Sequence, residues 1–412
     1  MTLSAYAEVQ GRVTRSLRDT WLFDAFWVAF LVGITRINIL PDFNTLAWAA
    51  ADGLAVFAII REPEAFLATL NRNKLIVSWP VLASLSFFWS LTPMSSLYHG
   101  IQFLMVLFVA FVFFRNLGVM RLVRILFIYN LILQLGSAAL LTSGIPVPGM
   151  FTGLFGHKNL LGMFSTLQIM CAGMLFLAGW RRWLCAASIV LALVLLGLSA
   201  SGTSILLTAV VIPLFFIARI VQRGMHPAFT LAGVAVALVG GVGLLMVMSG
   251  QTDPVESIFQ LLGKDDTLTG RSILWEFGMQ SIADNPVLGV GFQAYWASPG
   301  SSAAYLVFVI DQELEMFHNV YVEVTVALGL VGLVLFVSGV SQQIWRSLVY
   351  LIRQGTAISC WPFLFMVWIA MLCTTENPIF GNSHLQFIFA MTAAATYACD
   401  PRFGRIMPGD RA

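Results

Sequence analysis

The residues best suited to chemistry begin with a histidine at the edge of an apolar stretch. His318 and Asn319 come first, and Glu323 is the only carboxylate among residues 320 to 341. Asn319 and Glu323 are four residues apart and share a helix face, with His318 one position round and above them. An imidazole at a membrane boundary can act as a general base near neutral pH, although a lone interfacial histidine is more often an ordinary polar residue. Glu323 would be costly in lipid and should face a cavity or a partner.

A second polar block, Gly156-His157-Lys158-Asn159, could bind an anion. Asn159 could cap the helix that follows, and the positive end of that helix would add to the charge of Lys158. Such a pocket suits phosphate or carboxylate groups. An ordinary capped loop with an interfacial lysine explains the same residues equally well.

A third block lies in the long polar stretch 250 to 317, where Thr-Gly-Arg ends at Arg271 and Trp275 follows. Residues 271 to 283 are predicted to form an amphipathic helix that packs its apolar side towards the membrane and ends at Asn285-Pro286. Arg271 at the helix start would present a guanidinium fork suited to phosphate oxygens. Pairing with a neighbouring carboxylate is the alternative, because this stretch holds nine carboxylates and two cations.

The composition defines the elements that must position these residues. The 412-residue chain is 59% hydrophobic and 10% charged, with a mean hydropathy of +0.86. A soluble domain carries about 25% charged residues. These values exclude a water-soluble globule and a disordered chain, and the net charge of +2 offers no concentrated basic patch for nucleic acid. The sequence therefore predicts an all-α polytopic membrane protein.

Apolar windows long enough to cross a bilayer recur along the chain, and we predict about twelve transmembrane helices. The windows cover residues 22–40, 44–60, 75–91, 97–114, 122–142, 160–179, 183–200, 203–221, 228–249, 318–341, 357–374 and 384–399. This divides the chain into helices 1 to 9 over residues 1–249, one large periplasmic loop over 250–317, and helices 10 to 12 over 318–412. The first apolar run is expected to stay in the membrane as an anchor.

The cations give the orientation. With the N-terminus in the cytoplasm, 18 of the 22 lysines and arginines fall on the cytoplasmic side, as expected for short loops. Lys158, Lys264 and Arg271 lie outside, and Arg36 lies within the first span near its outer end. Both termini are therefore predicted to be cytoplasmic, with the polar blocks on the outer face.

Taken in order, the blocks resemble the O-antigen ligase and polymerase superfamily of bacterial envelope glycosyltransferases, whose fold is GT-C-like. The amino-acid sequence of the 156–159 block is most similar to that of the exopolysaccharide-polymerase branch, which joins succinoglycan-type repeat units. The resemblance rests on Gly156-His157-Lys158-Asn159 with Leu161-Gly162, Thr269-Gly270-Arg271 with Trp275, Asn285-Pro286, Gly289-x-Gly291, and His318-Asn319 with Gly329 and Gly332.

The resemblance implies a metal-independent transferase without a cofactor, using a polyprenyl-pyrophosphate-linked glycan donor on the outer face of the inner membrane. It implies that Arg271 binds pyrophosphate and that His318 activates the acceptor hydroxyl. The expected partners are the donor, a glycan acceptor, the lipid bilayer and other polysaccharide-assembly proteins. Nucleic acid is not expected.

The resulting hypothesis is inverting glycosyl transfer on that face. Arg271, with Lys158 and Arg36, would neutralise the leaving pyrophosphate. His318 would accept the acceptor proton, with Glu323 or another outer carboxylate orienting it. The remaining candidates for substrate binding are His157, Asn159, Asn319 and Trp275, with Tyr295, Trp296 and Tyr305 as stacking platforms and Glu376 as a lining residue of the same cavity.

Two alternatives use the same topology. An O-antigen ligase would pass the lipid-linked glycan to lipid A core or to a protein. A secondary transporter would also have twelve helices, but its site should lie near the membrane midplane, whereas these polar residues gather at the outer end.

Overall fold

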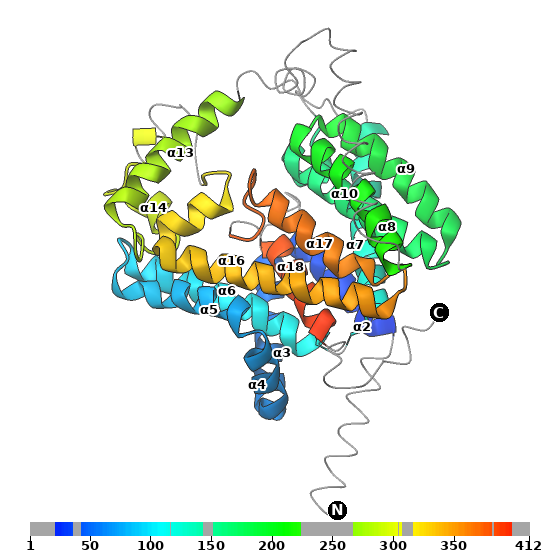
Figure 1. The fold of residues 1–412 in the computed structure, drawn as a ribbon, viewed down its shortest axis with the longest axis horizontal. Helices are drawn as coiled ribbons and strands as arrows, with labels where there is room; N and C mark the ends of the chain where they lie inside the picture. The colour runs from blue at the N-terminus through cyan, green and yellow to red at the C-terminus, as the bar shows by residue number, and fades with distance from the viewer. Residues whose placement is uncertain are drawn as a thin grey trace, which may run out of the picture.

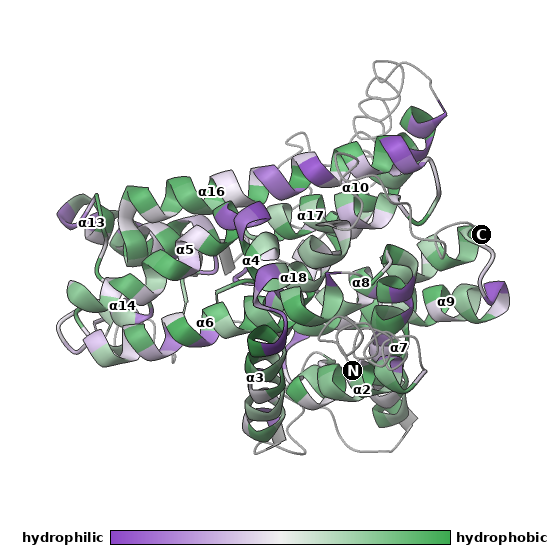
Figure 2. Cartoon of the chain, turned by 90° about the horizontal axis from the view of Figure 1, so that it is seen from below, coloured by the Kyte–Doolittle hydropathy of each residue, from purple (hydrophilic) through white to green (hydrophobic). Residues whose placement is uncertain are grey.

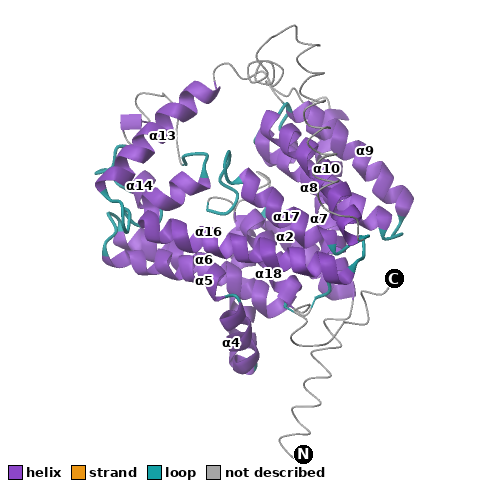
Figure 3. Ribbon diagram, viewed as in Figure 1, coloured by secondary structure: helices purple, strands orange, loops and turns teal. Residues whose placement is uncertain are grey.

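A computed structural model describes residues 21–35, 43–115, 117–142, 151–223, 267–303, 305–306, 316–380 and 383–397. Within these ranges every regular element is a helix, as Figure 3 shows. Helices satisfy their own backbone hydrogen bonds, which suits a chain this apolar. The all-helical prediction is confirmed.

Each predicted span other than 228–249, which lies outside the described residues, overlaps a helix. The helices are α2 (Trp21–Ile34), α3 (Phe43–Arg61), α4 (Pro63–Arg72), α5 (Lys74–Leu85), η1 (Ser86–Phe88), α6 (Pro93–Phe114), α7 (Val119–Thr142), η2 (Gly153–Phe155), α8 (Lys158–Leu177), α9 (Arg182–Ser199), α10 (Gly202–Gln222), α13 (Thr267–Asp284), α14 (Ala294–Ala297), α16 (Val320–Gln354), α17 (Cys360–Leu372) and α18 (Ser383–Tyr397).

Six helices of the described part are long and apolar enough to cross a membrane: α6, α7, α8, α9, α10 and α16. Shorter apolar helices accompany them, and Figure 2 shows hydrophobic residues along most of both sets. The chain is a polytopic membrane protein.

The helices form a bundle with a smaller helical group at one end. In Figure 1, α7 to α10 pack together on one side, while α16 runs along α5 and α17. Helices α13 and α14 lie at the opposite end, where α13 packs on α16. The predicted site residues lie on segments that are far apart in the sequence and that this arrangement brings into one bundle.

The smaller group has its own apolar core, formed by Leu274, Val290, Tyr295, Ala303, Leu306, Phe317 and Val326. Ile273, Phe277 and Ile282, which were expected to pack towards the membrane, pack against this protein core instead. Helix α13 also begins at Thr267, so Arg271 lies in its second turn and not at its start. Packing against neighbouring protein segments explains the first difference, since local hydropathy cannot tell lipid from protein.

Helix α16 is broken at Gly329, inside the window that the sequence predicts as one span. Gly329 has φ 64° and ψ −167°, a conformation that essentially only glycine adopts. The 25 residues that follow extend about 37 Å, enough to cross a hydrocarbon core of about 30 Å. Glu323 therefore belongs to a separate first segment of α16, visible before the bend in Figure 1.

The loop after α13 satisfies the backbone groups that this break leaves open. Leu330 N–H donates to the Pro286 carbonyl at 2.9 Å, and Val290 N–H donates to the Val326 carbonyl at 3.0 Å. A Cβ at Gly329 would lie 2.2 Å from the backbone of Val287. The predicted turn at Asn285-Pro286 is confirmed. In the loop that follows it, the backbone of Val287 lies too close to Gly329 for a side chain at position 329.

Candidate functional site

His318 holds an unusual backbone conformation at the start of α16. Its φ is 51°, in the left-handed region, which costs energy for a residue other than glycine and persists where the surroundings fix it. The side-chain oxygen of Asn319 accepts hydrogen bonds from the N–H groups of Tyr321 (2.9 Å) and Val322 (3.3 Å). Asn319 is therefore the N-cap of α16 and fixes the chain just after His318.

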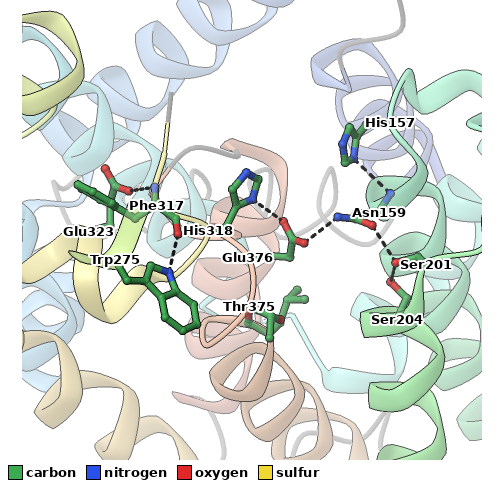
Figure 4. A network of polar contacts seen from close by, with 11 residues as sticks. His157, Asn159, Ser201, Ser204, Trp275, Phe317, His318, Glu323, Thr375 and Glu376 are labelled. Atoms are coloured by element: carbon green, nitrogen blue, oxygen red, sulfur yellow. Dashed lines mark hydrogen bonds and ion pairs between the residues drawn. The ribbon is translucent and has the colours of Figure 1, made fainter. Parts of the chain in front are cut away.

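Two more predicted site residues fix the chain just before it. Trp275 Nε1–H donates to the Phe317 carbonyl at 3.0 Å, and Phe317 N–H donates to Glu323 Oε2 at 2.8 Å. The other carboxylate oxygen of Glu323 accepts from Trp296 Nε1–H at 2.9 Å. Glu323 thus has protein partners, as its burial in an apolar helix requires. Figure 4 shows the contacts of Trp275 and Glu323 with Phe317 beside His318.

The carboxylate at the imidazole is Glu376, not Glu323. His318 Nδ1 lies 3.3 Å from Glu376 Oε2. The side chain of His318 is 28% exposed and that of Glu376 only 7%. Val320 N–H donates to the Cys373 carbonyl at 2.8 Å, which joins the start of α16 to the end of α17 and brings Glu376 to His318.

Glu376 also reaches the 156–159 block. Asn159 Nδ2–H donates to Glu376 Oε1 at 2.7 Å, and Ser201 Oγ–H donates to Asn159 Oδ1 at 3.0 Å. The structure thus brings together two blocks that are 159 residues apart in sequence. Figure 4 shows Glu376 between His318 and Asn159.

The N-cap of α8 differs from the prediction. The cap is His157, whose Nδ1 accepts the backbone N–H of Asn159 at 3.2 Å. Asn159 does not cap the helix because its side-chain amide is engaged by Glu376 and Ser201. Lys158 is the first helical residue of α8, where the positive end of the helix adds to its charge.

The predicted cations are placed to different extents. Arg271 lies on α13 one helical turn before Trp275, the residue that binds the Phe317 carbonyl next to His318. The side chain of Arg271 and the whole of Arg36 lie outside the described residues. The contact with the histidine segment is thus made by Trp275, and the contacts of the cations themselves stay a prediction.

The three aromatic candidates for sugar stacking also differ in exposure. Tyr295 is 3% exposed inside the small apolar core, and burial raises the pKa of its phenol, so it is a packing residue. Trp296 is partly buried and engaged with Glu323. Tyr305 is 59% exposed, with its ring 5.9 Å from that of Phe277, and it alone of the three offers an open aromatic face.

Two functional candidates had little or no local signal. The sequence predicts Glu376 only as a lining residue of the cavity, and it gives no signal for Ser201. Their importance depends on contacts with His318 and Asn159 that no local pattern encodes.

The fold and the site together define the class of protein. It is a polytopic helical membrane protein in which a partly exposed histidine contacts a buried carboxylate. A family model described as O-Antigen ligase matches residues 187–337, which include Arg271, Trp275 and His318. The 156–159 block precedes this match.

Among individual relatives, the Exopolysaccharide production protein ExoQ of Rhizobium meliloti (strain 1021) is 35% identical over 271 residues. The aligned residues cover 63% of this chain and 62% of the relative's length. Together with the family match, this confirms the predicted resemblance to the O-antigen ligase and polymerase superfamily, and the relative's name refers to exopolysaccharide production.

Proposed function

We propose that this chain is a glycosyltransferase of the bacterial inner membrane that joins polyprenyl-pyrophosphate-linked oligosaccharide repeat units into exopolysaccharide or O-antigen. The similarity to an exopolysaccharide production protein supports polymerisation as the role. The observation that carries the proposal is the contact of His318 with Glu376, because a partly exposed imidazole backed by a buried carboxylate is suited to accepting a proton.

In the proposed reaction, a hydroxyl oxygen of the acceptor sugar attacks the anomeric carbon of the donor from the side opposite the leaving group. The new glycosidic C–O bond forms as the bond between the anomeric carbon and the pyrophosphate oxygen breaks. The hydroxyl proton passes to His318, and the electron pair leaves with the polyprenyl pyrophosphate. The anomeric configuration is inverted.

Charge on the leaving pyrophosphate would be met by cations, without a metal ion. Lys158 at the start of α8 and Arg271 on α13 are the candidates, together with Arg36 in the first predicted span. Fixed cations aimed at developing charge lower the barrier because they need little reorganisation during the reaction. The position of Lys158, one residue from Asn159, supports its role at this site.

The proposed topology has twelve spans, both termini in the cytoplasm and the His318 end of the bundle in the periplasm. The segregation of cations in the sequence supports it. The first segment of α16 with α13 and α14 would stand at the outer surface, where lipid-linked sugars are presented.

The second candidate is an O-antigen ligase, favoured by the description of the family model that matches residues 187–337. It would use the same donor and the same base but transfer the glycan once, to lipid A core or to a protein. Both candidates require His318 to act on an acceptor hydroxyl.

The products distinguish the two. Purified protein would be incubated with lipid-linked repeat units isolated from a producing strain that lacks this gene product. A ladder of lipid-linked lengths is expected from the native chain, and none from His318→Ala or Arg271→Ala protein that remains folded. A single transfer to added lipid A core would instead support the ligase, and normal ladders from both variants would refute the proposal.

A further inference from the structure

We propose that Glu376, held in place by Asn159, fixes the proton on Nδ1 of His318 and so leaves Nε2 as the atom that accepts the substrate proton. The inference rests on the proposed function and deepens it. It makes Glu376 and Asn159 positioning residues of the base. The juxtaposition that carries it is one carboxylate with His318 on one oxygen and Asn159 on the other.

The orientation of the Asn159 amide follows from the chemistry of its neighbours. The hydroxyl of Ser201 donates to Asn159 Oδ1 at 3.0 Å, and its oxygen also lies 3.1 Å from Ser204 Oγ. The Asn159 NH₂ group then faces Glu376, and an ionised carboxylate, which only accepts, matches it. Asn159, with its oxygen directed to Ser201, therefore presents a donor to Glu376, and Glu376 acts as the acceptor.

An acceptor at Glu376 determines the tautomer of His318. A neutral imidazole carries one N–H, and the nitrogen that bears it is set by the hydrogen bond that the ring makes. With Glu376 Oε2 beside Nδ1, the N–H lies on Nδ1 and the lone pair lies on Nε2. Once Nε2 takes a proton, the imidazolium gains an ion pair with Glu376, which stabilises the charge formed during transfer.

This assignment changes the role of the 156–159 block. Its asparagine was predicted to bind substrate, yet both ends of its side-chain amide are engaged by protein groups. The block thus supplies support for the base through Asn159, and the proposed role of Lys158 towards the anionic donor is a separate one. A change at Asn159 should therefore act through Glu376.

Glu376→Gln tests the tautomer directly. A glutamine that accepts from Asn159 must turn its NH₂ towards His318 Nδ1, which moves the imidazole proton to Nε2 and disables the base. The probe is the lipid-linked repeat unit from the producing strain that lacks this gene product, and rates are normalised to the amount of monodisperse protein. The kcat of the variant should fall about 100-fold, which is in the range expected when general-base catalysis is lost. KM should stay within about threefold, since Glu376 is not placed at the substrate.

Two variants serve as controls. Glu376→Asp keeps an acceptor-only carboxylate on a shorter side chain and should recover about tenfold of the lost kcat. Glu62→Gln removes a carboxylate from its ion pair with Arg115, distant in sequence from His318, and should leave kcat unchanged. Equal kcat values for the Gln and Asp variants at position 376 would overturn the inference.

A double-mutant cycle tests the link to Asn159. Asn159→Ala should lower kcat about tenfold in the native background, and by less than twofold in the Glu376→Gln background, because both changes disable one unit. Reductions that multiply would show independent roles and would also overturn the inference.

The outcome for His318→Ala separates this inference from the proposed function. An inactive His318→Ala protein with a fully active Glu376→Gln protein would remove the inference and leave the proposed function standing. An active His318→Ala protein would remove the proposed function as well.

Discussion

Two buried carboxylates flank the same histidine, and they differ in what they bind. Glu323 accepts from the backbone N–H of Phe317, next to His318, and from the indole N–H of Trp296 on α14. Glu376 contacts the imidazole itself and an amide from another helix. The Glu323 side of the histidine is therefore structural, and we call it the clamp side. The Glu376 side contacts the ring, and we call it the imidazole side.

The comparison shows that burial near a histidine does not by itself tell which group a carboxylate binds. The clamp side should govern the stability of the folded protein, because it holds His318 in its left-handed conformation and α16 in its broken form. The imidazole side should govern the rate of each turnover, because its contacts determine where the ring proton resides. Variants on the two sides should separate stability from rate.

The largest effect on the clamp side is expected at Gly329. In Gly329→Ala the new Cβ would sit 2.2 Å from Val287 backbone in a conformation that only glycine adopts readily, at a cost of about 3 kcal/mol or more. The midpoint temperature of thermal unfolding in detergent should therefore fall strongly. Gly53→Ala is the matched control, since a Cβ there meets nothing within 4 Å. Equal unfolding midpoints for both variants would contradict the clamp.

Glu323→Gln should be the next most destabilising change. Both oxygens of Glu323 accept N–H donors, so a glutamine must turn its NH₂ towards one of them and leave it unpaired. The expected loss of unfolding free energy is about 1.5–3 kcal/mol, larger than that of Glu376→Gln. Unfolding curves of the two variants decide this, and a reversed order would break the comparison.

Asn319→Ala should cost less, because it removes one helix cap. The loss of an N-cap side chain lowers stability by about 1 kcal/mol. Asn319→Asp keeps an oxygen for the N–H groups of Tyr321 and Val322 and should unfold near the native midpoint. An alanine variant as stable as the aspartate variant would argue against the cap.

The smallest effect should come from Ser201→Ala on the imidazole side. The change removes the donor to Asn159 Oδ1 and loosens the amide that holds Glu376. Turnover should fall by at most about fivefold, equivalent to one neutral hydrogen bond of about 1 kcal/mol. Initial elongation rates measure this, and a loss as large as that of Glu376→Gln would mean that Ser201 has another role.

Hydropathy predicted the helices because it is a local property of each stretch. Each window with described residues overlaps a helix, and the predicted stop at Asn285-Pro286 is confirmed. The break at Gly329 could not be predicted, since it depends on a loop some 40 residues earlier that offers its backbone to the open helix ends. A glycine inside an apolar window was its only signal.

The site was predicted in part. His318 and the 156–159 block were identified and the structure brings them together, whereas the residue between them received little weight. Glu323 was chosen to orient the base because it is four residues from Asn319, and nearness in sequence favoured it over Glu376, which approaches only through folding. The contacts of Arg271 and Arg36 stay predictions.

The most direct test of the central claim is the rate of the first glycosidic bond formed by His318→Ala protein in lipid nanodiscs. A labelled lipid-linked repeat unit would be bound first, its amount measured, and the acceptor then added in a single turnover. We predict normal binding of the lipid-linked unit and a rate at least about 100-fold lower than that of the native chain. Bond formation at the native rate would contradict the assignment of His318 as the proton acceptor.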